Sequence, residues 1–347
     1  MHHTRTLART ALGAGDVAVT ALSFGAAGIG NLFTPVGTAQ AAGAVDAAWD
    51  AGIRYFDTAP HYGLGLSERR LGDTLRTRPR HEYVVSTKVG RILRPLTGSG
   101  SRAGDDLAHG FAVPATHRRV WDFSAEGVRR SIDASLRRTG LDRIDIVYLH
   151  DPDGHPRQAF GQAYPELERL RAEGAVGAIG VGMNQTAMLT RFLRDTDVDV
   201  VLAAGRYTLL DQSALTELLP QAAERGKSVV VGGVFNSGLL ADPRPGAPYD
   251  YAAAPAPLLE RALRLKEVTA RHGVPLRAAA LQFPFGSPAV ASVLVGTRSA
   301  EEVRDAAAML AHPVPGDMWA ELCAEGLLPD GVPVPGAPVP KEPRPCA

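Results

Sequence analysis

The sequence predicts a closed (β/α)₈ barrel, the TIM-barrel fold, built as a single domain. Eight short runs rich in β-branched residues alternate with amphipathic segments from near the N-terminus to about residue 311. Several of these runs are apolar almost throughout, which is typical of parallel strands buried on both faces. The Gly-rich stretch "GLGLSERRLG" lacks the spacing of a Rossmann fingerprint, so an open dinucleotide-binding sheet is disfavoured.

Each expected strand is a short run that helical patterns separate from the next. In chain order the strands are "VTALSFG", "IRYFDTA", "EYVVSTK", "RIDIVYLH", "VGAIGVG", "VDVVLAA", "KSVVVGG" and "SVLVG". Amphipathic periodicity predicts helices over residues 39–51, 67–75, 124–140, 163–173, 213–225 and 257–272. Ser124 and Gly140 suit the N-cap and the stop signal of the third helix.

Two segments depart from the plain repeat. Residues 91–122 make a connection far longer than an ordinary βα loop, which is typical of a lid or binding loop. Phe111 and Trp121 are candidates for the walls of a substrate site; the alternative is a surface insertion without fixed structure. Residues 1–326 are assigned to the barrel, and residues 327–347 to a Pro-rich, extended tail.

Composition limits the partners. Lys and Arg total 37, as do Asp and Glu, so the net charge does not recommend nucleic acid or an anionic membrane. A small molecule is the expected partner. The two cysteines, Cys323 and Cys346, lack metal-ligand spacing and suggest a reducing cytoplasm. No apolar run is long enough for a membrane span, and the oligomeric state stays open.

Four reactive side chains follow consecutive strands: Asp57 and Tyr62 after the second, Lys88 after the third and His150 after the fourth. In a (β/α)₈ barrel these ends meet at the rim that carries the active site. Taken singly, each residue has an ordinary structural explanation. Together they would be four coincidences at one place, so we expect a catalytic group.

The chemistry of these side chains is complementary. A neighbouring ammonium stabilises a phenolate, so Lys88 is expected to lower the pKa of Tyr62. Asp57 would keep Lys88 charged, and His150 would orient the reacting oxygen. This set predicts general acid/base chemistry on a carbonyl or alcohol without a metal. His61 is a candidate pocket residue, although an exposed loop histidine fits the pattern equally well.

Six stretches carry a family resemblance. "GIRYFDTAPHYGLGLSERRLG", "VVSTKVGR", "DIVYLHDPD" and "VGAIGVGMNQ" resemble the aldo-keto reductase superfamily over about residues 16–312. "GGVFNSGLL" and "VLVGTRSAEEV" are most similar to its branch of sugar 1-dehydrogenases, L-galactose dehydrogenase and pyridoxal 4-dehydrogenase. The resemblance implies a tetrad of Asp57, Tyr62, Lys88 and His150, with Tyr62 transferring the proton, and a bound NAD or NADP.

The same resemblance implies a cofactor site. Asn184 falls where the family holds the nicotinamide carboxamide. Many members stack an aromatic ring on the nicotinamide after strand seven. This chain has Gly232 or Gly233 at that position, so Phe235 or a backbone surface would have to take the place of the ring. The remaining positions are Asn236, Ser237, Gly238 and Leu240 over the pyrophosphate, then Gly296, Thr297, Arg298 and Glu302 at the adenosine end. A carboxylate at Glu302 would repel a 2′-phosphate and favours NAD slightly, while Arg298 would favour NADP.

The expected activity is oxidation of an aldose at C1 to a lactone, which the branch resemblance implies. Within the same class, the alternatives are a pyridoxal-type alcohol or a general aldehyde or ketone reductase. A channel-type regulatory subunit on the same fold is an alternative from another class, since fold alone does not fix function. A metal-dependent hydrolase is disfavoured because no clustered ligands end the strands.

Overall fold

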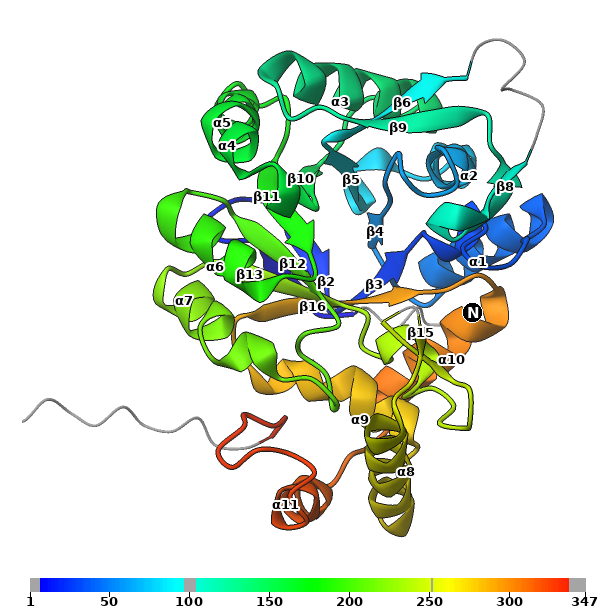
Figure 1. Cartoon of the computed structure of the whole chain (residues 1–347), viewed down its shortest axis with the longest axis vertical. Coiled ribbons are helices and arrows are strands. Elements are labelled where there is room, and N and C mark those ends of the chain that lie inside the picture. Colours follow the sequence, from blue (N-terminus) through cyan, green and yellow to red (C-terminus); the bar gives the residue numbers. More distant parts are fainter. Residues whose placement is uncertain (1–6, 97–103, 251, 337–347) are drawn as a thin grey trace, which may run out of the picture.

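A computed structural model describes residues 7–96, 104–250 and 252–336. Eight parallel strands close into a barrel in their order along the chain, with helices around the outside (Figure 1). The predicted (β/α)₈ barrel is therefore confirmed. The barrel strands are β3 (Leu22–Gly25), β4 (Tyr55–Asp57), β5 (Val84–Val89), β10 (Ile146–His150), β11 (Ala178–Met183), β12 (Val200–Ala204), β13 (Ser228–Gly232) and β16 (Val290–Gly296).

The helices cover the outer face of the barrel, and α8 packs beside α11 below it in Figure 1. They are α1 (Thr38–Asp50), α2 (Leu66–Leu75), α3 (Ala125–Thr139), α4 (Pro156–Gln158), α5 (Tyr164–Ala172), α6 (Thr186–Asp195), α7 (Leu218–Glu224), α8 (Ala256–Arg271), α9 (Leu276–Gln282), α10 (Ala300–Ala311) and α11 (Gly316–Ala324). The helix expected over residues 213–225 is too long, because Pro220 is tolerated only in a first turn and α7 accordingly begins at Leu218.

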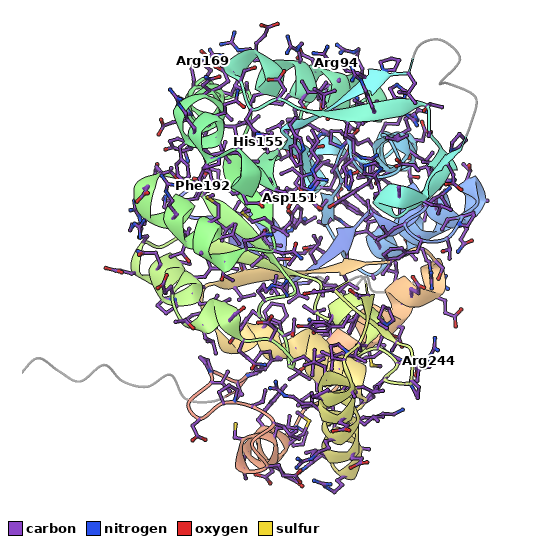
Figure 2. The ribbon with its side chains drawn as sticks, in the orientation of Figure 1. Arg94, Asp151, His155, Arg169, Phe192 and Arg244 are labelled. Atoms are coloured by element: carbon purple, nitrogen blue, oxygen red, sulfur yellow. The ribbon has the colours of Figure 1, made fainter. Side chains whose placement is uncertain are left out.

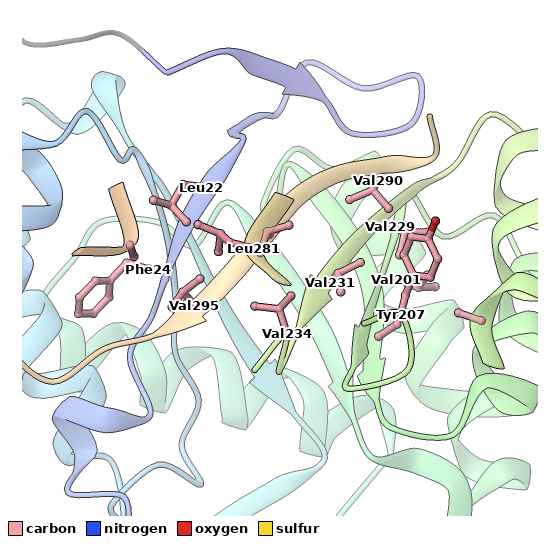
Figure 3. Close-up of a cluster of buried hydrophobic side chains, with 14 of the residues drawn as sticks. Leu22, Phe24, Val201, Tyr207, Val229, Val231, Val234, Leu281, Val290 and Val295 are labelled. Carbon is pink, nitrogen blue, oxygen red and sulfur yellow. The ribbon is translucent and has the colours of Figure 1, made fainter. Parts of the chain in front are cut away.

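Strand residues alternate between two cores. Tyr55, Ile146 and Tyr148 point into the barrel, whereas Phe56 and Val147 belong to the larger core beneath the helices. Figure 3 shows part of that larger core, where side chains of β3, β13 and β16 meet Leu281 of α9. Because side chains alternate with a period of two, this register decides which strand residues reach the barrel mouth.

The expected first strand divides into two elements. β2 (Ala18–Thr20) pairs with β1 (Arg9–Ala11) in a hairpin, and only β3 enters the barrel. The Thr20 hydroxyl donates to Leu22 O at 2.7 Å, across the break. Leu12 and Val19 of this hairpin pack against the interior side chains of the barrel, so the hairpin closes the end away from the candidate site.

The long connection after β5 has regular structure where it is described. β6 (Arg91–Pro95) pairs with β9 (His117–Trp121), and β7 (Asp105–Asp106) pairs with β8 (Phe111–Pro114). We call the described residues of this connection, 91–96 and 104–121, the β6–β9 arm. It is tied to the barrel where Phe33 N donates to Gly110 O at 2.7 Å.

A short hairpin and the start of the Pro-rich tail pack on the barrel outside the main repeat. β14 (Pro248–Tyr249) and β15 (Ala252–Ala253) form a short hairpin beside the loop after β13. At the start of the Pro-rich tail, Leu327 and Leu328 are buried against the core, while the rest of the tail from residue 337 lies outside the described residues. In the part of the chain that is described, no helix has the length and apolar character that a membrane span requires.

Candidate active site

The alternation of the strands brings three predicted side chains to one place. Asp57 lies two residues after the inward-facing Tyr55, and His150 lies two residues after the inward-facing Tyr148. Lys88 is held against Asp57 from β5. The three side chains therefore meet at the carboxyl end of the barrel interior.

Tyr62 reaches the same place from the loop after β4. Its ring centroid lies 4.7 Å from Lys88 Nζ and 6.0 Å from the ring centroid of His150. The chain then turns at Gly63, whose φ is +58°. A Cβ there would lie 2.1 Å from Gly30 O, so only glycine lets the two loops approach this closely.

Lys88 and Asp57 form a buried ion pair, with Nζ 2.5 Å from Oδ2 and side-chain exposures of 3% and 2%. Lys88 also donates to Thr58 O at 3.1 Å, and Ser86 donates to Asp57 Oδ1 at 2.6 Å. Burial alone would lower the pKa of Lys88, but Asp57 and Tyr62 outweigh that effect and raise it. Lys88 is therefore an ammonium at neutral pH, as the sequence reasoning required.

A chain of hydroxyl groups supports this pair from below. The Tyr55 hydroxyl lies 3.0 Å from the Ser86 hydroxyl and 3.0 Å from that of Tyr148. Ser86 in turn donates a hydrogen bond to Asp57, which fixes the orientation of that carboxylate. Sequence reasoning missed Ser86, although its position two residues before Lys88 on the same strand was a usable signal.

The pKa of Tyr62 is raised, contrary to the expectation. Burial of the phenol raises it most, Lys88 lowers it and Asp57 raises it further. The predicted effect of Lys88 is present, but it is smaller than the cost of charging a phenol in a dry barrel mouth. Lys88 thus reduces the rise in the pKa of Tyr62 but does not bring that pKa below its ordinary value.

His150 is neutral. Burial lowers its pKa well below the ordinary value, and Arg91 and Lys88 lower it further. Within the described chain its Nδ1 is buried without a hydrogen-bond partner. A buried N–H without an acceptor is costly, so the proton belongs on Nε2, from which it can be donated into the mouth of the barrel.

His61 and Phe111 support the site from behind. Arg119 Nε donates to His61 Nδ1 at 2.5 Å, and burial with Arg91 and Arg119 nearby lowers the pKa of His61 to about 2. Phe111 is 2% exposed, with its ring centroid 5.2 Å from that of His61. Predicting Phe111 as a substrate wall was wrong, because the β6–β9 arm buries it under the site.

A cavity of about 760 Å³ extends from the barrel mouth across the ends of β13 and β16. Most of the predicted cofactor residues line it: Asn184, Phe235, Asn236, Ser237, Gly238, Gly296, Thr297, Arg298 and Glu302. Leu240 does not, because it is fully buried in the outer core and its backbone N donates to Phe235 O. Its prediction as a cofactor residue was wrong.

The chemistry of this cavity fits a dinucleotide. Asn236 Oδ1 and Thr297 Oγ1 are buried polar atoms without a protein partner in the described chain, and both residues line the cavity. Asn236 and Ser237 have φ values of 46° and 59°, in the left-handed region that residues other than glycine seldom adopt, and two such residues follow each other here. Unpaired polar atoms and a strained turn beside a long cavity suit an extended polar ligand.

The far end of this cavity, where the adenosine would lie, carries paired charges. Arg298 Nε donates to Glu302 Oε1 at 2.8 Å, and its backbone N donates to Glu302 Oε2 at 2.8 Å. Arg277 donates to Asp305 at 2.8 Å in the same region. Sequence reasoning missed this second pair, because nothing in the helical pattern of α9 shows that Arg277 faces α10.

A second cavity, of about 360 Å³, lies beside His150. Arg91, Trp121, Asp151, Asp153, His155 and Asn184 line it, and Asn184 also lines the larger cavity. Trp121, which the sequence marked as a candidate substrate wall, is 44% exposed. Within the described ranges, no group of three or more His, Cys, Asp or Glu side chains is placed to hold a metal ion.

A buried lysine–carboxylate pair beside a tyrosine and a neutral histidine, at the mouth of a barrel with a dinucleotide-sized cavity, defines an NAD(P)-dependent oxidoreductase. The chain belongs to the aldo/keto reductase family, whose model matches residues 21–324. The resemblance seen in the sequence motifs is therefore confirmed.

Two curated relatives match almost end to end. The chain is 48% identical to D-threo-aldose 1-dehydrogenase of Pseudomonas sp. over 322 residues, which cover 92% of this chain and 98% of the relative. It is 40% identical to pyridoxal 4-dehydrogenase of Microbacterium luteolum, covering 94% and 99%. A solved aldo-keto reductase of Bacillus halodurans, in its holo form, superposes with a TM-score of 0.72 at 25% identity, covering 94% and 98%.

We expect Tyr62→Phe and Lys88→Met each to lower turnover about a hundredfold or more while nucleotide still binds, because general acid/base catalysis commonly contributes that much. Steady-state kinetics and nucleotide titration by fluorescence measure the two effects. Tyr164→Phe is the control, since it removes a phenol on α5 that donates to Glu168. Near-normal turnover in folded Tyr62→Phe would contradict the assignment.

Proposed function

We propose that this enzyme oxidises an aldose at C1 to the corresponding lactone, with Tyr62 as the general base. The Asp57–Lys88 pair beside Tyr62 and His150 is the observation that carries the proposal. The relative at 48% identity, a D-threo-aldose 1-dehydrogenase, supports the substrate class. In the other direction the same groups would reduce a carbonyl.

In the proposed reaction the anomeric hydroxyl donates its proton to Tyr62 as the C1–H bond breaks and the C1=O bond forms. When bound, NAD(P)⁺ would accept the hydride that leaves C1. His150 donates from Nε2 to the reacting oxygen and holds it against Tyr62. Lys88 stabilises the phenolate that oxidation requires, and Asp57 with Ser86 keeps Lys88 in place.

Nine predicted residues would hold the cofactor. Asn184 and Phe235 are assigned to the nicotinamide end, Asn236–Gly238 to the pyrophosphate, and Gly296–Arg298 with Glu302 to the adenosine end. Leu240 is left out because it is buried. NAD is favoured over NADP, since Arg298 is already paired with Glu302 and Arg277 with Asp305. A 2′-phosphate would have to compete with those carboxylates.

The substrate class is tested by a cofactor-reduction panel of aldoses, a pyridoxal-type alcohol and simple alcohols. We expect aldoses to give the highest kcat/KM, and the lactone to be recovered as the product. The relative at 40% identity makes a pyridoxal-type alcohol the second candidate. Activity on that alcohol with none on any aldose would replace the proposal with the second candidate.

The oxidative rate should rise with pH. Oxidation needs deprotonated Tyr62, and burial raises the pKa of this phenol above its ordinary value of about 10. The rate of oxidation should therefore increase from neutral pH through the alkaline range, whereas reduction needs the protonated form and should fall there. Profiles of kcat in both directions measure this, and an oxidative rate that declines from pH 7 to 10 would argue against Tyr62 as the base.

Glu302→Arg should raise kcat/KM with NADP and lower that with NAD, because it removes the partner of Arg298 and adds a cation. The native enzyme should accept NAD at least as well as NADP. Glu301→Arg is the matched control, since Glu301 lines the same cavity but is not bonded to Arg298. A strong native preference for NADP, or an equal gain in both variants, would show that the ribose contact is elsewhere.

A further inference from the structure

The second cavity opens where β10 ends, directly beside the candidate catalytic histidine. Figure 2 labels Asp151 and His155, which lie on the side of the barrel where α4 begins. Arg91 and Trp121 line the cavity from the β6–β9 arm, and Asn184 joins it to the larger cavity. A ligand in this cavity would therefore lie next to the reacting atoms and the cofactor end.

We propose that Asp151, with Trp121 beside it, binds the hydroxyl group on the carbon next to the reacting carbon and so selects polyhydroxylated substrates. This inference rests on the proposed oxidation of an aldose. It assigns a role in specificity to Asp151 and Arg91, which lie within the quoted sequence motifs but were given no role there.

The distance from Asp151 to His150 carries the inference. Asp151 Oδ2 lies 3.7 Å from His150 Nε2, the atom that would donate to the reacting oxygen. That is too long for a hydrogen bond between the two side chains. The carboxylate is nevertheless close enough to Nε2 for one substrate to place a hydroxyl group at His150 and the neighbouring hydroxyl group at Asp151.

The position of Asp151 is fixed by its surroundings. Its φ is +45°, and its backbone N donates to Gly182 O at 3.1 Å, so the strained conformation is held by the adjacent strand β11. Arg91 pairs with its Oδ2. A carboxylate accepts at both oxygens, so Oδ1 remains as an acceptor on the partly exposed side chain.

Trp121 supplies an apolar surface in the same cavity. Its ring stacks on Phe123 with centroids 5.9 Å apart and the planes at 18°, and Arg91 lies 4.5 Å from its centroid. The ring is thus fixed in place and still 44% exposed. A rigid, half-exposed indole suits the C–H face of a sugar ring.

The charges of the cavity favour a neutral polyol. Arg91 is paired with Asp151, and Asp153 adds a second carboxylate. The side chains offer donors and acceptors together, with one more negative charge than positive, so a phosphate or carboxylate substrate would be repelled. Simple aldehydes would leave these polar groups without partners.

The test compares one aldose from the panel with its 2-deoxy analogue. Wild-type enzyme should prefer the aldose at least about tenfold in kcat/KM, since losing a hydrogen bond to a charged group typically costs that much. In Asp151→Asn the activity on the aldose should fall about 10- to 100-fold, and the preference should shrink to within about threefold. This shift in preference is the readout that general damage to the site would not produce.

Asp153→Asn is the matched control, because it removes the same charge from the same cavity without the contact to His150. It should change both substrates by the same factor. Nucleotide titration confirms that each variant is folded. If wild type uses both substrates equally, or if Asp151→Asn lowers both equally, the inference fails while aldose oxidation stands. If no aldose is oxidised, the proposed function fails and this inference falls with it.

Discussion

The ion pair between Lys88 and Asp57 is the constraint on which the site depends. Removing two charges from water is costly, and such a pair is tolerated only with close geometry and further hydrogen bonds. Here Ser86 and the carbonyl of Thr58 provide them, and the hydroxyl chain through Tyr55 and Tyr148 extends below. The barrel interior is therefore polar at the level of the pair, and the ammonium stays beside the phenol that it would stabilise in the proposed reaction.

Burial and the cations around the mouth together set the protonation of the remaining groups. Burial lowers the pKa of His61 and of His150 most, and Arg91 and Lys88 lower both further, so these rings remain neutral within a positively charged region. A neutral His150 can donate to an oxygen that gains negative charge without adding a proton that competes with Tyr62. Lys88 also opposes part of the rise that burial causes in the pKa of Tyr62.

The barrel and the clustering of Asp57, Tyr62, Lys88 and His150 could be anticipated because both depend on local patterns: strand-end position, a period of two and short motifs. Ser86 could have been predicted from the same period of two, because it lies two residues before Lys88 on the same strand. Arg91 with Asp151 and Arg277 with Asp305 could not be found this way, because each pair depends on how side chains outside the barrel strands pack against one another. Phe111 and Leu240 were misplaced for a related reason: whether a loop side chain lines a cavity or packs beneath it depends on tertiary contacts.

Each cation of the site has a carboxylate partner, but the pairs differ in depth. Side-chain exposures are 3% and 2% for Lys88 and Asp57, and 49% and 39% for Arg298 and Glu302. Exposed pairs contribute little and are screened by salt, whereas breaking a buried pair leaves an uncompensated charge. The proposed adenosine end could therefore change its charges, and with them the nucleotide preference that we propose for it, at little cost to the fold. The charges of the buried Lys88–Asp57 pair cannot change at so little cost. The centre of the site must therefore stay fixed, whereas its exposed end can vary.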